Sequence, residues 1–325
     1  MSDQVLSTGP HVAINAIAAE TPRRSPAAPA AGQRARFARL LALPGQAIAV
    51  VVLVLPLVVA LAMSFTDWTP TRGSLREASW VGALNYEELL VWDTRFLEAV
   101  ARTLAITAIC LSVEFALGLG LAVIFSREFR GKSVLFSVLL TPMMVMPIVV
   151  GYTFWMLFQS DGPINQVLDL LFGITPQWFR SPGFAWTAVI VTEVWHWTPL
   201  FFLILLSGLN SLPQNPIRAA VILGASRRQV FWRVVLPMLG PVIRVAFVIR
   251  FIEVIKLFDE VFMLTRGGPS TATETISLYI YKVAFQDFQL AYSAAAAFLV
   301  LFGTLLLVHL LMTPMRAQLF AERTR

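Results

Sequence analysis

Long apolar runs alternate with shorter polar segments along the chain, and six of the runs are long enough to cross a bilayer as helices. A hydrocarbon core about 30 Å thick requires about 20 mostly apolar helical residues. The sequence therefore predicts an all-α polytopic membrane protein with six transmembrane helices. The predicted spans are residues 47–65, 103–125, 134–158, 185–206, 242–263 and 291–312.

The composition excludes a water-soluble globule and a disordered chain. Soluble domains are about half apolar and about a quarter charged. This chain is 57% hydrophobic and only 14% charged, with a mean hydropathy of +0.73. Its net charge of +6 does not indicate nucleic acid, because the arginines are scattered between apolar blocks and form no basic face. We expect membrane lipid around the chain and no nucleic-acid partner.

The distribution of Lys and Arg predicts the direction of the spans. With the N-terminus in the cytoplasm, 15 of these residues fall in cytoplasmic segments and 7 on the opposite side, leaving Arg244, Arg250 and Lys256 inside the fifth span. Positive residues collect on the cytoplasmic side of membrane proteins. Both termini are therefore predicted to be cytoplasmic, with a disordered tail at 1–45, a transmembrane domain at 46–315 and a C-terminal tail at 316–325.

The cytoplasmic segment 207–241 carries its own folding signals. Asn215 is expected to cap a short helix over Ile217–Leu223, with Pro216 at its first position. Gly224 breaks that helix, and Ser226 with Gln229 forms a capping box for a second, amphipathic helix that Pro237 ends. We predict a bent element along the membrane face; the alternative is a loop that only covers helix ends.

Several spaced motifs resemble those of one transporter family. Arg218-Ala219-Ala220-x-x-x-Gly224-Ala225-Ser226, with Phe231 and Leu236-Pro237, resembles the cytoplasmic "EAA" loop of binding-protein-dependent ABC importer permeases. Further segments are similar to its carbohydrate branch, the maltose-permease-like subunits. They are Trp80-Val81-Gly82-x-x-Asn85-Tyr86, Lys256-Leu257-Phe258-Asp259, Leu264-Thr265-Arg266-Gly267-Gly268-Pro269, Thr273-Glu274-Thr275 and Tyr279-Ile280-Tyr281.

This resemblance implies the type I ABC importer permease fold in the plasma (inner) membrane of a bacterium. It implies that the loop around Gly224 is a coupling helix seated in a cleft of a separate ATPase. The partners implied are a second homologous permease, two copies of the ATPase, which holds ATP and Mg, an extracytoplasmic solute-binding protein and a carbohydrate. The coupling residues would be Arg218, Ala219, Ala220, Gly224, Ala225 and Phe231. Arg218 departs from the family's usual Glu, and Leu223 from a common Asp.

The chain shows no catalytic motif and no cofactor site of its own. Gly131-Lys132-Ser133 resembles the end of a phosphate-binding loop, but Ser126 stands where the upstream glycine is required. The histidines, His11, His196 and His309, lack metal-ligand spacing. The sequence therefore predicts a transport subunit rather than an enzyme. An ion-coupled secondary transporter is the alternative, although no repeat of the first three spans is evident in the last three.

Ionisable side chains within the spans are the candidates for contact with solute, because such groups are costly in a membrane and usually face a cavity or a partner. Two readings of the fifth span stay open: a self-neutralising stripe against the partner permease, or a wall whose carboxylates accept hydrogen bonds from sugar hydroxyls. Glu114 is expected to be structural. The candidates are Glu193, Trp195 and His196 on the fourth span and Lys256, Asp259 and Glu260 on the fifth.

Overall fold

The computed structural model describes residues 41–323, with the backbone alone at Arg72, Leu75 and 313–323. The chain divides into two compact units, Met1–Leu57 and Val58–Arg325, which are described separately. Most of the predicted N-terminal tail and the last two residues lie outside the described part. Residues 41–45, predicted to belong to that tail, are helical, as are residues 316–323 of the predicted C-terminal tail.

The described part of the first unit is a helix with exposed apolar side chains. The helix continues into the second unit and covers Leu41–Met63 in all, including a π-helical turn, η1 (Val50–Val54), and α2 (Leu55–Met63). Its exposed valines and leucines match the solvent of a bilayer rather than water. The predicted first span, 47–65, falls on this helix.

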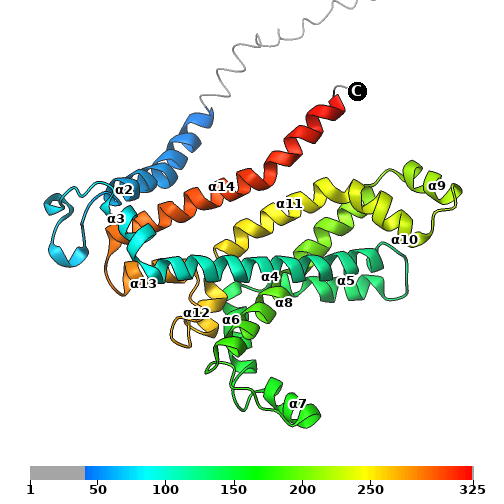
Figure 1. Cartoon of the computed structure of the whole chain (residues 1–325), viewed down its shortest axis with the longest axis horizontal. Helices are drawn as coiled ribbons and strands as arrows, with labels where there is room; N and C mark the ends of the chain where they lie inside the picture. Colours follow the sequence, from blue (N-terminus) through cyan, green and yellow to red (C-terminus); the bar gives the residue numbers. More distant parts are fainter. Residues whose placement is uncertain (1–40, 324–325) are drawn as a thin grey trace, which may run out of the picture. The chain divides into compact units, whose positions relative to one another are not determined.

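The second unit is helical throughout its described residues, apart from loops and one isolated bridge between Thr66 and Trp80. Its long helices are α4 (Thr94–Phe125), α8 (Pro182–Ser211), α11 (Leu236–Ile255) and α14 (Leu290–Arg323), labelled in Figure 1. The shorter elements are η2 (Pro70–Arg72), η3 (Leu75–Glu77), α3 (Leu84–Glu87), η4 (Glu88–Trp92), α5 (Lys132–Leu140), η5 (Pro142–Met144), α6 (Pro147–Leu157), α7 (Pro163–Phe172), α9 (Gln214–Ile222), α10 (Arg227–Val230), η6 (Phe231–Val235), α12 (Asp259–Leu264) and α13 (Ile276–Phe285).

Within the described residues, five helices are long and apolar enough to cross a membrane: Leu41–Met63, Thr94–Phe125, Pro182–Ser211, Arg227–Ile255 and Leu290–Met312. The predicted continuous helix at 134–158 is wrong, because α5 ends at Leu140 and α6 begins at Pro147. Pro142 and Pro147 lack the N–H that an uninterrupted helix would use, and each starts a new helical segment instead.

The helix predicted over 242–263 is shifted toward the N-terminus. It begins at Arg227, passes through the π-helical turn η6 and ends at Ile255; after a break at 256–258, α12 is a separate helix. Pro237 lies just after the π-helical turn η6, where the regular α-helical hydrogen-bond pattern is already interrupted, so its missing N–H does not end the helix. The prediction that Pro237 ends a separate amphipathic helix is therefore wrong, since that segment is the beginning of a long apolar helix.

Helices α4, α8 and α11 form the centre of the second unit. Figure 1 shows α4 beside α8, and a Cβ on Gly118 of α4 would lie only 2.7 Å from Cβ of Phe201 on α8. The ring of Phe247 on α11 contacts Phe115 and Phe201, with centroids 5.1 and 5.3 Å away. This close packing fixes the relative rotation of the three helices, and with it the side chains of the candidate site.

Candidate functional site

A polar cavity of about 230 Å³ opens where α6, α8, α11 and α12 meet. The break at 256–258 supplies part of its wall, because the chain leaves the helix there before α12 begins. Ionisable side chains line most of the remainder. The lining residues are Pro147, Glu193, Trp197, Arg250, Glu253, Lys256, Leu257, Phe258, Asp259 and Glu260.

Arg250 lies at the base of this cavity and is fully buried. Its Nε and Nη2 donate to the two carboxylate oxygens of Glu114 on α4, at 2.9 and 2.8 Å. Nη2 also donates to Oε1 of Glu193 on α8, at 2.8 Å. Its guanidinium lies 4.9 Å from the centre of the Trp197 ring. One cation therefore joins three helices, and removing either carboxylate would leave a buried charge partly uncompensated.

Two polar atoms at the base have no partner among the described residues. They are Oε2 of Glu193, an acceptor, and Nη1 of Arg250, a donor, and both belong to buried side chains that line the cavity. Buried polar atoms in folded proteins are nearly always hydrogen-bonded. The base of the cavity therefore holds one acceptor and one donor that the described residues leave unpaired.

His196 lies behind the cavity wall and is fully buried. Its Nδ1 is 3.0 Å from Oε1 of Glu260, and its Nε2 is 3.1 Å from the carbonyl oxygen of Val145. A carbonyl and an ionised carboxylate only accept hydrogen bonds, whereas a neutral imidazole has a single N–H. For both contacts to be hydrogen bonds, the His196–Glu260 pair must hold one more proton than a neutral histidine beside a carboxylate.

Glu260 is held from a second side by close packing of the backbone. A Cβ on Gly151 of α6 would lie 2.9 Å from the Cα of Glu260, closer than a real side-chain atom comes. Only glycine permits this approach of α6 to α12. The position of the Glu260 carboxylate thus depends on Gly151 as well as on His196.

The structure brings four of the six candidates to the cavity and leaves two outside it. Glu193, Lys256, Asp259 and Glu260 line it, whereas His196 lies behind Glu260. Trp195 points elsewhere: its ring lies 5.2 Å from Phe154, and it borders an apolar groove beside Pro199. Trp197, two residues later and hence on a different face of the helix, is the tryptophan at the cavity.

One of the two open interpretations of the fifth span was a self-neutralising stripe of Arg250, Glu253 and Lys256, and only part of it forms between neighbours on the helix. Lys256 Nζ contacts Glu253 Oε1 at 3.1 Å, as the three-residue spacing suggests. Arg250 pairs instead with carboxylates of two other helices. Glu114 contacts Arg250 between helices, in agreement with its expected structural role.

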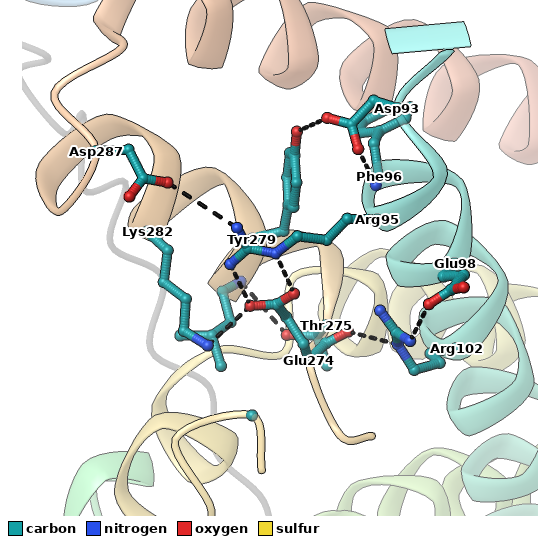
Figure 2. Close-up of polar contacts among 12 residues, drawn as sticks. Asp93, Arg95, Phe96, Glu98, Arg102, Glu274, Thr275, Tyr279, Lys282 and Asp287 are labelled. Carbon is teal, nitrogen blue, oxygen red and sulfur yellow. Dashed lines mark hydrogen bonds and ion pairs between the residues drawn. The ribbon is translucent and has the colours of Figure 1, made fainter. Parts of the chain in front are cut away.

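A second polar network fixes the connector between α12 and α13 (Figure 2). The buried Glu274 carboxylate accepts hydrogen bonds from Nε and Nη2 of Arg95, both at 2.9 Å, and from Lys282 Nζ at 2.8 Å. Arg102 donates to the carbonyl oxygen of Glu274 at 3.3 Å and to Glu98 at 2.9 Å. The Thr-Glu-Thr motif therefore anchors the connector to the beginning of α4.

Electrostatics favour the ionised form of Glu274. Its burial acts to raise the pKa of the carboxyl group, but the hydrogen bonds and charges of Arg95 and Lys282 outweigh burial and lower the pKa below its ordinary value. The carboxylate therefore keeps its contacts at neutral pH.

Neighbouring contacts tie this connector to the cavity wall. Thr275 donates from Oγ1 to the carbonyl oxygen of Leu257 at 2.8 Å, and Leu257 belongs to the break that lines the cavity. Thr103 on α4 accepts a hydrogen bond from the backbone N–H of Ile276 at 2.8 Å. Tyr279 and Tyr292 both donate to Asp93 at the N-terminus of α4. Sequence reasoning recognised the motif but not these contacts, since those with Thr103 and Asp93 join residues more than 170 positions apart.

The bend predicted within 207–241 forms at the other end of α8, between α9 and α10. The capping box is confirmed: Ser226 N donates to Gln229 Oε1 at 2.8 Å, and Gln229 N to Ser226 Oγ at 3.3 Å. Gly224 ends the preceding turn with a φ of +81°, a conformation that favours glycine. Helix α9 begins at Gln214 after Pro213, so the prediction that Asn215 caps it is wrong. Arg218, Ala219 and Gly224 are exposed, and Ala220, Ala225 and Phe231 are half-buried.

Residues 114–313, which contain the cavity and the α9–α10 bend, match the family described as "Binding-protein-dependent transport system inner membrane component". The chain belongs to this family. The expected family resemblance is thus confirmed, and the protein is an ABC importer permease, a transport subunit of the membrane.

Proteins similar to most of the permease are also described as transport permeases. It is 37% identical over 259 residues to the "Probable ABC transporter permease protein y4oQ" of Sinorhizobium fredii, with 79% of this chain and 82% of the relative covered. It is 32% identical to the "Trehalose/maltose transport system permease protein MalF" of Thermococcus litoralis, over 77% of this chain and 84% of that one. It is 31% identical to the "Sulfoquinovosyl glycerol transport system permease protein SmoG" of Agrobacterium fabrum, over 80% and 84%.

The fold is that of a known importer. A chain of a bacterial ABC transporter involved in the import of the acidic polysaccharide alginate superposes with a TM-score of 0.76. The two chains are 20% identical, and the match covers 88% of the permease and 96% of the other chain. The predicted all-helical importer-permease fold is therefore confirmed.

Proposed function

We propose that the permease imports a carbohydrate (a sugar, oligosaccharide, polyol or sugar derivative) as half of the translocation path of an ATP-driven importer in the bacterial plasma membrane. The observation that carries this proposal is the polar cavity between α6, α8, α11 and α12 in a member of an import family. The names of its relatives, which include trehalose/maltose and sulfoquinovosyl glycerol permeases, support the solute class.

The cavity has the chemistry that a carbohydrate requires. Glu193, Asp259 and Glu260 offer carboxylate acceptors to hydroxyl groups, and Lys256 offers a donor. Trp197 adds an apolar ring face for sugar C–H groups. In this proposal His196 positions Glu260, and Trp195 does not contact the solute.

The α9–α10 bend is proposed as the coupling element that receives work from a separate ATPase. Arg218, Ala219, Ala220, Gly224, Ala225 and Phe231 would form the contact, and two copies of the ATPase would supply ATP and Mg. A second homologous permease would complete the path, and an extracytoplasmic binding protein would deliver the solute. Both termini and the bend would be cytoplasmic, with the Glu274 connector on the outer side.

Uptake into proteoliposomes tests this function. The permease pair is reconstituted with the ATPase and binding protein encoded beside it, and labelled solutes recognised by that binding protein are supplied. We expect uptake to require ATP, the ATPase and the binding protein. Uptake by the permease alone under a proton or sodium gradient would contradict the proposal and favour the ion-coupled alternative.

A further inference from the structure

The α9–α10 bend combines an exposed apolar tip with basic flanks. Ile222 and Leu223, at the end of α9, are 84% and 86% exposed, and Val221 beside them is 58% exposed. Gly224 turns the chain immediately after this tip. Exposing three consecutive aliphatic side chains to water is unfavourable. A contiguous apolar patch of this kind indicates a surface that binds a partner.

The charge of the same segment is entirely positive. Residues 207–241 contain four arginines and no aspartate or glutamate: Arg218, Arg227, Arg228 and Arg233. All four are exposed, and within the described part of the chain none of them forms an ion pair. These cations are therefore free to meet a partner's charges.

We propose that the bend docks into a cleft with an apolar floor and an acidic rim. Val221, Ile222 and Leu223 would enter the floor, while the four arginines would face carboxylates on the rim. This inference rests on the proposed function, in which the occupant of the bend is the separate ATPase. It specifies the charge of that ATPase surface, because complementary charge sets orientation and partner choice at interfaces.

The salt dependence of association tests the rim. The permease pair is immobilised in detergent, and binding of the ATPase encoded beside it is titrated. Raising the ionic strength from about 0.01 M to about 1 M shortens the screening length from about 30 Å to about 3 Å. We expect affinity to fall at least about tenfold across this range. Affinity that does not change with salt would overturn the acidic rim.

Substitutions at Arg227 and Arg228 test the acidic rim independently of salt. We expect R227E/R228E to weaken binding about tenfold at low salt, R227Q/R228Q to weaken it less, and R227K/R228K to match the wild type. The control R76E/R180E makes the same charge change on exposed arginines predicted to lie on the outer side, and should not alter binding. Wild-type affinity in R227E/R228E would overturn the inference.

Variants of the apolar tip distinguish two outcomes: that the acidic rim is wrong, or that the coupling role of the bend is wrong. L223D places a carboxylate at the tip, and thermal unfolding of the permease pair verifies that the variant is folded. If L223D releases the ATPase but the arginine variants do not, the acidic rim is wrong and the coupling element stands. If the ATPase still binds when Ile222, Leu223 and both arginines are changed together, the coupling role itself is wrong.

Discussion

Arg250 shows how one buried residue can organise several helices. Its guanidinium contacts Glu114 on α4 and Glu193 on α8, while its backbone belongs to α11. A buried ion pair does not by itself add stability, but breaking one leaves an unpaired charge in a medium that solvates it poorly. Individual contacts of this group therefore have large mutational effects.

We predict that E114A destabilises the permease by about 3–5 kcal/mol, because Arg250 loses its two-bond partner. Thermal and denaturant unfolding in detergent measure the change. The matched control is E98A on the same helix, whose side chain is 62% exposed and pairs with Arg102. It should cost less than about 1 kcal/mol. Equal effects of the two variants would contradict the structural role of Glu114.

Asp259 provides the corresponding test at the cavity. D259N keeps the shape of the side chain but removes its charge, so a hydrogen bond to a solute hydroxyl becomes weaker. We expect the solute concentration for half-maximal uptake to rise about tenfold or more, with binding of the ATPase unchanged. D169N, on the exposed face of α7, is the control. Unchanged uptake by D259N would remove Asp259 from the pathway.

At the scale of elements, the α9–α10 bend and the Glu274 connector are ordered in different ways. The bend depends on local signals, a capping box and a glycine with positive φ. The connector depends on side chains from α4 and α13. Local signals are legible in a sequence, and contacts between distant helices are not.

We predict that G224E leaves the permease in the membrane but abolishes both ATPase binding and ATP-driven uptake. A Cβ at Gly224 would meet no other atom within 4 Å, so the main structural cost is the φ of +81°, about 1–2 kcal/mol. G131E is the matched control, with a φ of +80° and equally open surroundings in the α4–α5 turn. Uptake and ATPase binding that survive in G224E would disprove the coupling role.

The Glu274 network predicts a specific pH dependence. The folded protein holds the Glu274 proton less tightly than the unfolded chain, because the pKa is lowered. The stability supplied by this group is therefore complete above its ordinary pKa of 4.5 and is lost as the pH falls through the lower, folded value. We expect the stability difference between the wild type and E274Q, measured by thermal unfolding, to shrink over that range. A difference that stays constant would contradict the network.

At the scale of the whole molecule, the sequence predicted the candidate site best where ionisable residues interrupt apolar runs. Glu193, Lys256, Asp259 and Glu260 were predicted as candidates because ionisable groups seldom occur in apolar runs, and the structure brings them to one cavity. Trp195 was predicted at the site, but Trp197 is the tryptophan that lines the cavity. Composition could not predict this, since it depends on the rotation of α8 against α4 and α11. That rotation is set by packing such as Gly118 against Phe201.

Helix boundaries were less predictable than helix identity, and proline explains most of the errors. Pro142 and Pro147 interrupt the predicted third span, whereas Pro237 was expected to end a helix that in fact continues. Proline interrupts a helix or lies within one according to the backbone hydrogen bonds of the turn around it. Hydropathy averaged over a span does not resolve that position.

The hydrogen bond from Thr275 to the carbonyl of Leu257 has a consequence for sequence variation. It joins the two ends of the intervening stretch, 258–274, so that this stretch forms a closed ring with fixed ends. An inserted or deleted residue in this ring would have to be absorbed without moving either end, whereas the turn at 126–131 is mostly exposed and has open surroundings at Gly131. Among relatives, length changes should therefore gather in that turn and avoid the ring.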